Sequence, residues 1–227
     1  MSSYKAPALS HDICKQIDTL AARLAEILQD APGQKRMLTR YIEQIALGCA
    51  LVKAQYQRMK SFEPLIFTDE VFDEIKMIVS DPSKLELVAL DQLLGKNSAI
   101  KTSEHTQNAL YHIGIKLFNE KDFVGAKAVF CLLVLFVPAD FLVWMSLGHT
   151  ESKLRHYHAA IIAYEMALGC VQDDPMVHLY LAYCYEALGE KQKALDALDA
   201  AIVCTQDVQI VEKAKANIRR IQGHKLR

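Results

Sequence analysis

A pattern of large and small residues recurs every 34 residues along the second half of the chain. In the clearest copy, large side chains alternate with small ones between Trp144 and Ala167. A unit that recurs at a fixed period stacks on its neighbours, because one copy cannot bury its own apolar face. The matching positions are Leu110, Ile113, Gly114, Phe123, Ala126 and Phe130 in the first copy, Trp144, Leu147, Gly148, Tyr157, Ala160, Tyr164 and Ala167 in the second, and His178, Leu181, Ala182, Ala194, Leu198 and Ala201 in the third.

This spacing is that of the tetratricopeptide repeat (TPR), a pair of antiparallel helices. The small residues, such as Gly148 and Ala160, allow two helices to approach closely. The sequence predicts three repeats at 107–140, 141–174 and 175–208, and an all-α fold in which these hairpins form a TPR superhelix. The alternative is an ordinary helical bundle with alanine-rich contacts.

An additional helical module is expected at residues 10–95. Its first helix is one that Ser10 can cap and that ends at residues 30–33. The second helix, about 35–62, carries apolar residues at roughly heptad spacing, which could face the first helix in a hairpin or a partner chain in a coiled coil. We favour the hairpin, and a homodimer through this module is the alternative. The heptad positions are Leu38, Tyr41, Ile45, Val52, Met59 and Phe62.

Helix-start and helix-stop signals divide the rest of the chain. Thr68 and the two acidic residues after it open a third helix, which Pro82 ends. The polar stretch 96–102 is the expected domain boundary. The TPR domain then spans 103–221, and residues 211–221 form a helix that covers the apolar face of the last repeat.

The composition excludes several classes of partner. The formal charge is −1, so no strong field attracts nucleic acid. The longest apolar run, 128–137, is half of what a membrane span needs, and no secretory signal is visible. The six cysteines are scattered, as expected for reduced thiols in the cytoplasm.

The sequence offers no catalytic constellation. His156 and His158 are two residues apart and point in different directions, so we interpret them as turn residues rather than metal ligands. Asp173 and Asp174 precede Pro175 and indicate a helix start. Because no nucleophile motif or glycine-rich phosphate loop is present, we expect no enzyme activity, cofactor or metal.

The candidate binding site is the concave face of the repeats, which the first helix of each repeat should line. Such an apolar face requires either a bound apolar partner or cover from the same chain, such as the N-terminal helices. A carboxylate clamp of lysine, asparagine and arginine is not expected, because the matching positions are mostly apolar. The candidate cargo-binding residues are Tyr111, Ile115, Phe118, Leu142, Met145, His149, Met176, Leu179 and Tyr183, and Asn108, Lys153 and Glu186 complete the face.

Residues 103–205 resemble the class II chaperones of bacterial type III secretion, which are small TPR proteins. The likeness rests on one set of residues in each repeat. These are Ala109-Leu110-Tyr111 with Phe118, Phe123, Ala126 and Phe130 in the first, Trp144-x-x-Leu147-Gly148 with Tyr157, Ala160, Ile161, Tyr164 and Ala167 in the second, and Ala182-x-Cys184-Tyr185-x-x-Leu188-Gly189 with Ala194 in the third. The resemblance implies a cytoplasmic protein that binds an extended hydrophobic segment of a secreted translocator in its concave groove. It does not extend to the N-terminal module, and a needle-subunit or effector chaperone would look similar.

Three functions therefore compete. The first is a secretion chaperone without enzymatic activity, and the second is a TPR adaptor that bridges two folded proteins. The third is an enzyme or regulator with its site in residues 10–95, which shows helix patterning but no reactive constellation.

Overall fold

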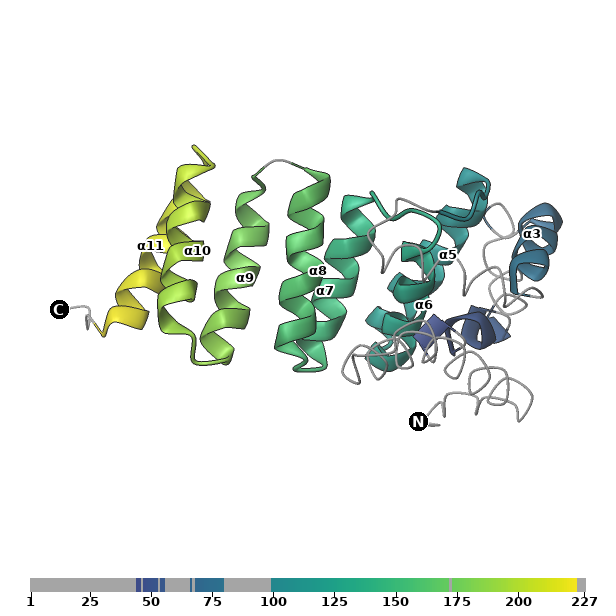
Figure 1. Ribbon diagram of the computed structural model, residues 1–227, viewed down its shortest axis with the longest axis horizontal. Coiled ribbons are helices and arrows are strands. Elements are labelled where there is room, and N and C mark those ends of the chain that lie inside the picture. The colour runs from purple at the N-terminus through teal and green to yellow at the C-terminus, as the bar shows by residue number, and fades with distance from the viewer. Residues whose placement is uncertain are drawn as a thin grey trace, which may run out of the picture. The chain divides into compact units, whose positions relative to one another are not determined.

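The computed structural model describes residues 44–45, 47–52, 54–55, 66, 68–79, 99–171 and 173–223. Every regular element in these ranges is a helix (Figure 1), which confirms the predicted all-α TPR fold. The chain divides into two compact units, residues 1–138 and 139–227. We describe each unit by itself.

Unit 1 contains the first helical hairpin, made by α5 (Glu104–Asn119) and α6 (Phe123–Val134). The two helices meet where the sequence pairs a glycine with an aromatic residue. A Cβ atom added to Gly114 would lie 2.6 Å from Cε1 of Phe130, whose side chain is fully buried. The predicted alternation of small and large residues thus sets the distance between the helices.

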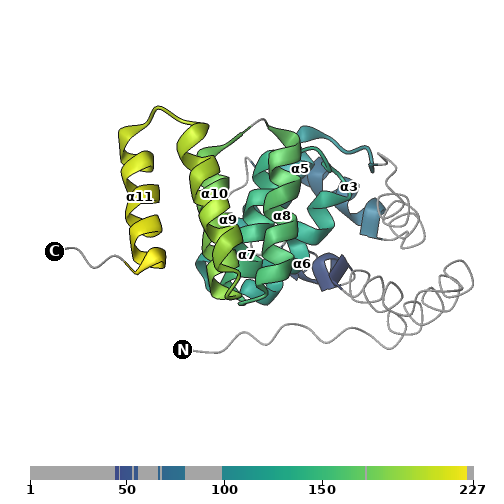
Figure 2. The ribbon, with the colours of Figure 1, turned by 60° about the vertical axis from the view of Figure 1, so that its left-hand side comes forward.

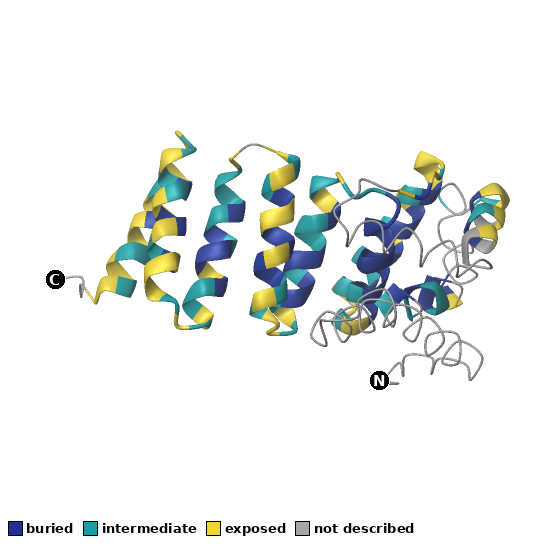
Figure 3. Cartoon of the chain, viewed as in Figure 1, coloured by how far each residue is buried: buried dark blue, intermediate teal, exposed yellow. Residues whose placement is uncertain are grey.

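The helical residues 47–52 of the N-terminal module lie against α6 at Gly48. Gly48 lies against the backbone of Ala128, and most of α6 is buried (Figure 3). Ile45 and Val52, two positions of the predicted heptad seam, are buried within unit 1. These two residues therefore do not face a partner chain. The other seam positions, and the predicted hairpin with the first helix, lie outside the described residues.

A second N-terminal helix, α3 (Asp69–Val79), is held to the start of α5 through Glu74. The backbone N–H of Ser103 donates to Oε1 of Glu74 at 2.7 Å, and the hydroxyls of Ser103 and Thr106 donate to Oε2 at 2.5 Å each. Burial acts to raise the pKa of the Glu74 carboxyl, but these hydrogen bonds outweigh it, so the pKa is lowered. The ionised carboxylate is therefore the form that joins α3 to α5.

We expect Glu74→Gln to lower the melting temperature at pH 7, by an effect below about 1 kcal/mol because the carboxylate is partly solvated. A lowered folded-state pKa contributes stability above the unfolded pKa of about 4.3, and this stability disappears as the pH falls through the folded value. The difference between the two proteins should therefore shrink below about pH 4. Thermal melting between pH 3 and 7 measures it, with the exposed Glu70→Gln on the same helix as the control. A difference that does not depend on pH would contradict the assignment.

Unit 2 stacks α7 (Phe141–Lys153), α8 (Tyr157–Cys170), α9 (Pro175–Ala187), α10 (Lys191–Val203) and α11 (Val208–Gln222) in chain order (Figure 1). In the first hairpin, a Cβ atom on Gly148 would lie 2.6 Å from Cε1 of Tyr164. Ala160 and Ala194, at the small positions of α8 and α10, are fully buried. The close approach predicted from the 34-residue period is thus present here as well.

The last helix, α11, lies beside α10 at the end of unit 2 (Figure 2). Ala214 is fully buried, and Ile210, Ile218 and Ile221 pack against the core of the unit. Arg220 forms a bidentate ion pair with Glu186 of α9. This helix occupies the place of the predicted capping helix and begins three residues earlier.

The 34-residue period also appears in the backbone. The turns between the two helices of each repeat contain a residue with positive φ, at Lys121 (65°), Arg155 (61°) and Gly189 (77°). This conformation costs an L-residue roughly 1–2 kcal/mol and costs glycine little. The turn geometry of the repeat is therefore kept even where the sequence has a long basic side chain.

Candidate functional site

The candidate site in unit 2 is the α7/α9 surface, which we define by Leu142, Met145, His149, Met176 and Tyr183. Asp140 and Asp174 begin the two helices, because their carboxylates accept hydrogen bonds from backbone N–H groups in the first turns. The predicted helix start at Asp174 is thus confirmed. Leu142 is 57% exposed and Tyr183 is 55% exposed, whereas the other three are half-buried. The helices present apolar side chains to solvent.

The two methionines have a double role. Met145 and Met176 pack against the core of unit 2 while part of each side chain stays accessible. Unbranched thioether side chains adapt to partners of different shape. The methionines can therefore support folding and still contact a ligand. Leu142 and Tyr183 are more exposed and contribute less to the core.

The prediction for Leu179 is wrong in one respect, since the side chain does not reach the surface. It is 7% exposed and belongs to the core of unit 2. The physical reason is the position of α9, which packs against α8, α10 and α11. More of its circumference is buried than the repeat pattern alone suggests.

Three further predicted residues, Tyr111, Ile115 and Phe118, lie on α5 in unit 1 and are half-buried. The Tyr111 ring is 5.9 Å from the Phe130 ring, and the Phe118 ring is 5.2 Å from the Phe123 ring. These two aromatics thus contribute to the α5–α6 hairpin as well as to its surface.

An aromatic cluster joins α7, α8 and α9 beneath the α7/α9 surface. The His149 ring meets the Tyr180 ring edge-on at 4.5 Å and the Tyr164 ring at 5.7 Å, and the two tyrosine rings stack at 5.6 Å. Burial lowers the pKa of His149, and the charge of Lys153 lowers it further. The imidazole is therefore neutral at pH 7. Tyr180 was not among the predicted residues, although its spacing of four from Met176 and three from Tyr183 could have indicated it.

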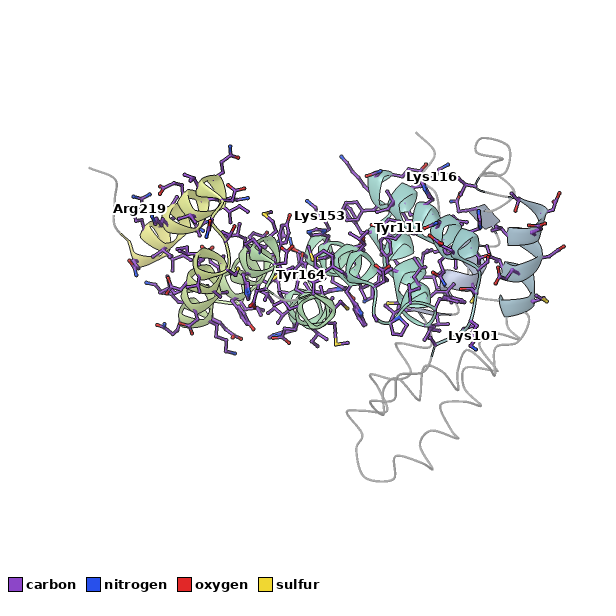
Figure 4. The ribbon with its side chains drawn as sticks, turned by 90° about the horizontal axis from the view of Figure 1, so that it is seen from above. Lys101, Tyr111, Lys116, Lys153, Tyr164 and Arg219 are labelled. Carbon is purple, nitrogen blue, oxygen red and sulfur yellow. The ribbon has the colours of Figure 1, made fainter. Side chains whose placement is uncertain are left out.

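The other end of the surface carries two cations. Lys153 ends α7 and Arg155 lies in the following turn, and both are exposed; Figure 4 marks Lys153 and the buried Tyr164. The pKa of Tyr183 is raised, chiefly by its hydrogen bond with Tyr157, while the charge of Arg155 acts in the opposite direction. Lys153 follows His149 by four residues on α7, and Arg155 precedes Tyr157, whose ring is 6.1 Å from the ring of Tyr183.

The two turn histidines differ in their contacts. His156 places Nδ1 2.8 Å from Oε2 of the buried Glu151, an acidic neighbour that the sequence analysis did not expect. His158 is exposed. Among the described residues, no three histidine, cysteine, aspartate or glutamate side chains gather as metal ligands.

None of the five cysteines in the described residues forms a disulfide bond. Cys184 is fully buried, and burial raises its pKa to about 11. In the part of the chain that the structure describes, no helix is long and apolar enough to cross a membrane.

No protein-family model and no curated protein sequence matches the chain. Solved structures do match. PcrH, from Pseudomonas aeruginosa, in complex with the chaperone-binding region of PopD, is 20% identical, and the match covers 55% of this chain and 97% of PcrH with a TM-score of 0.51. The Yersinia enterocolitica type III secretion chaperone SycD, in complex with a peptide of the translocator YopD, is also 20% identical, with coverage of 55% and 98% and a TM-score of 0.51.

A chain of the CopN–Scc3 complex is 29% identical over 56% of this chain and 79% of that chain, with a TM-score of 0.49. The likeness to PcrH and SycD establishes a common fold. These structural neighbours are class II type III secretion chaperones, the family that residues 103–205 resemble in sequence.

Proposed function

We propose that the chain is a cytoplasmic class II type III secretion chaperone, which binds an extended hydrophobic segment of a secreted, translocator-like protein and keeps it soluble until export. The shared fold supports this function, because SycD and PcrH were solved with a translocator peptide and with a chaperone-binding region. Exposed apolar side chains on the α7/α9 surface are the observation that carries it.

The physical argument starts from Leu142 and Tyr183, which are more than half exposed on two helices that are otherwise well packed. Exposed apolar groups that lie together mark an interaction site more often than single ones do. Met145 follows Leu142 by three residues on α7, and Tyr183 follows Met176 by seven on α9, so each pair lies on one face of its helix. A hydrophobic segment that binds along this surface would remove these side chains from water together with its own apolar side chains.

The aromatic cluster beneath the surface supplies rigidity. Tyr164 is 1% exposed and Tyr180 stacks on it, so the backbone positions of α7, α8 and α9 are fixed relative to one another. A partner that is disordered when free would meet a preformed surface, which lowers the entropy that has to be lost on binding. The flexible methionines then adjust to the bound side chains.

The test is replacement of Leu142 by glutamate. Burial of such a side chain against a partner contributes about 1.5–3 kcal/mol, so the variant should bind its cargo roughly ten- to hundredfold more weakly. The protein is purified with its bound partner from the cells that make it, the partner is identified by mass spectrometry, and its affinity for both proteins is measured. Because Leu142 is 57% exposed, the melting temperature should hardly change.

The matched control is Ile162→Glu on α8. Ile162 is 58% exposed, so the two substitutions are alike in size, charge and solvent exposure. If Leu142→Glu retains its cargo as well as the control does, the α7/α9 surface is not the binding site. The adaptor function would be favoured instead by two results together. The partner would stay soluble in the absence of this chain, and it would no longer bind to the Ile162→Glu variant.

A further inference from the structure

The cationic end of the α7/α9 surface has no acidic partner among the described residues. Lys153 and Arg155 are exposed and form no ion pair there. Lys153 follows His149 by four residues on α7, so the two lie on one face of that helix. Arg155 lies two residues before Tyr157, whose ring is 6.1 Å from the ring of Tyr183. The cations are therefore part of the surface on which the cargo would lie.

Four glutamates of the surrounding elements already have other partners. Glu151 of α7 contacts His156, and Glu186 of α9 pairs with Arg220. Glu190, before α10, pairs with Lys193 at 2.6 Å. Glu165 of α8 accepts a hydrogen bond from the Tyr185 hydroxyl at 3.3 Å. These four carboxylates therefore have other partners, and no ion pair joins Lys153 or Arg155 to a described acidic residue.

We infer that the cargo segment carries acidic residues next to its apolar side chains, and that Lys153 and Arg155 bind them. This inference rests on the proposed function and adds a charge requirement to it. The apolar part of the segment would lie on Leu142, Met176 and Tyr183, and its acidic part would lie at the C-terminal end of α7. Complementary charge of this kind selects between partners of similar hydrophobicity.

The experiment uses three fluorescent peptides that share one apolar core of leucine, isoleucine and proline. The core is flanked by glutamates, by glutamines or by lysines, and binding to the full chain is measured by anisotropy. The glutamate peptide should bind about fivefold more tightly than the glutamine peptide, as expected for exposed ion pairs, and the lysine peptide most weakly. The preference should vanish at about 1 M salt, where charges are screened beyond about 3 Å.

Three double variants locate the effect. Lys153→Glu/Arg155→Glu should reverse the order of the peptides, whereas Lys191→Glu/Lys213→Glu should keep it. Lys191 and Lys213 are exposed on α10 and α11, so both variants change the net charge equally. If Lys153→Glu/Arg155→Glu has a lowered melting temperature, Lys153→Gln/Arg155→Gln replaces it. This variant should abolish the preference for the glutamate peptide.

The outcomes separate this inference from the proposed function. Equal binding of the glutamate and glutamine peptides, with both weakened by Leu142→Glu, would overturn the charge requirement and leave the chaperone function standing. If no peptide binds, the proposed function fails, and the inference fails with it. A preference that the Lys191/Lys213 control loses as well would assign the effect to net charge and refute the role of Lys153 and Arg155.

Discussion

Replacement of Gly148 by alanine is expected to destabilise unit 2 by about 1–3 kcal/mol, the usual cost of overpacking. The added Cβ would lie 2.6 Å from Cε1 and 2.7 Å from Cδ1 of Tyr164. The ring cannot move aside freely, because it is buried and stacked on Tyr180. Displacement of this ring would also move the cluster beneath the α7/α9 surface, so cargo affinity should fall together with stability.

Gly169→Ala is the matched control, since it adds the same methyl group to α8. No atom lies within 4 Å of a Cβ at that position. Alanine is favoured over glycine in a helix by up to about 1 kcal/mol, so this variant should be neutral or slightly more stable. Chemical denaturation measures both. Equal stabilities of the two variants would mean that the α7–α8 hairpin is not packed as described.

Replacement of Gly48 by alanine should weaken the contact between the N-terminal module and α6. The Cβ atom would lie 2.4 Å from the carbonyl oxygen of Ala128 and 3.2 Å from Cβ of Leu132. A backbone carbonyl inside a helix cannot rotate away, so the N-terminal helix must move. We expect a loss of about 1–3 kcal/mol in unit 1, despite the better helix propensity of alanine.

The neighbouring Cys49 provides a local readout of this movement. Burial raises the pKa of its thiol to about 12, so it is protonated and unreactive at neutral pH. In Gly48→Ala the thiol should become more exposed, its pKa should fall, and alkylation of the peptide that contains Cys49 should become faster. An unchanged rate, with Gly169→Ala as the reference, would show that residues 47–52 do not pack on α6 through Gly48.

The repeat architecture followed from the sequence because its cause is local and periodic. In the first two repeats a glycine faces an aromatic ring at the same spacing, Gly114 with Phe130 and Gly148 with Tyr164, and this lets the two helices approach closely. The helix start at Asp174 was predictable for the same reason, since the cap and its N–H donors lie within three residues.

The site was predictable only in part. The period identified Leu142 and Tyr183 as exposed apolar residues, and they are. It could not show that Leu179 is buried or that Tyr180 bridges His149 and Tyr164. Those outcomes depend on how deeply α9 sits between its neighbours, which the pattern within one repeat does not contain.

The sequence by itself determined the helical hairpins, their small and large contact residues and the apolar character of α7 and α9. Tertiary structure alone decided which residues from distant parts of the chain meet. The seam residues Ile45 and Val52 are equally suited to a partner chain by spacing, but they are buried in unit 1, where Gly48 lies against Ala128. Likewise, the sequence does not show which charged residues form ion pairs. Arg220 pairs with Glu186, whereas Lys153 and Arg155 pair with no described carboxylate. Hydrophobic spacing fixes which face of a helix is buried, but only the packing of the whole unit determines what covers it.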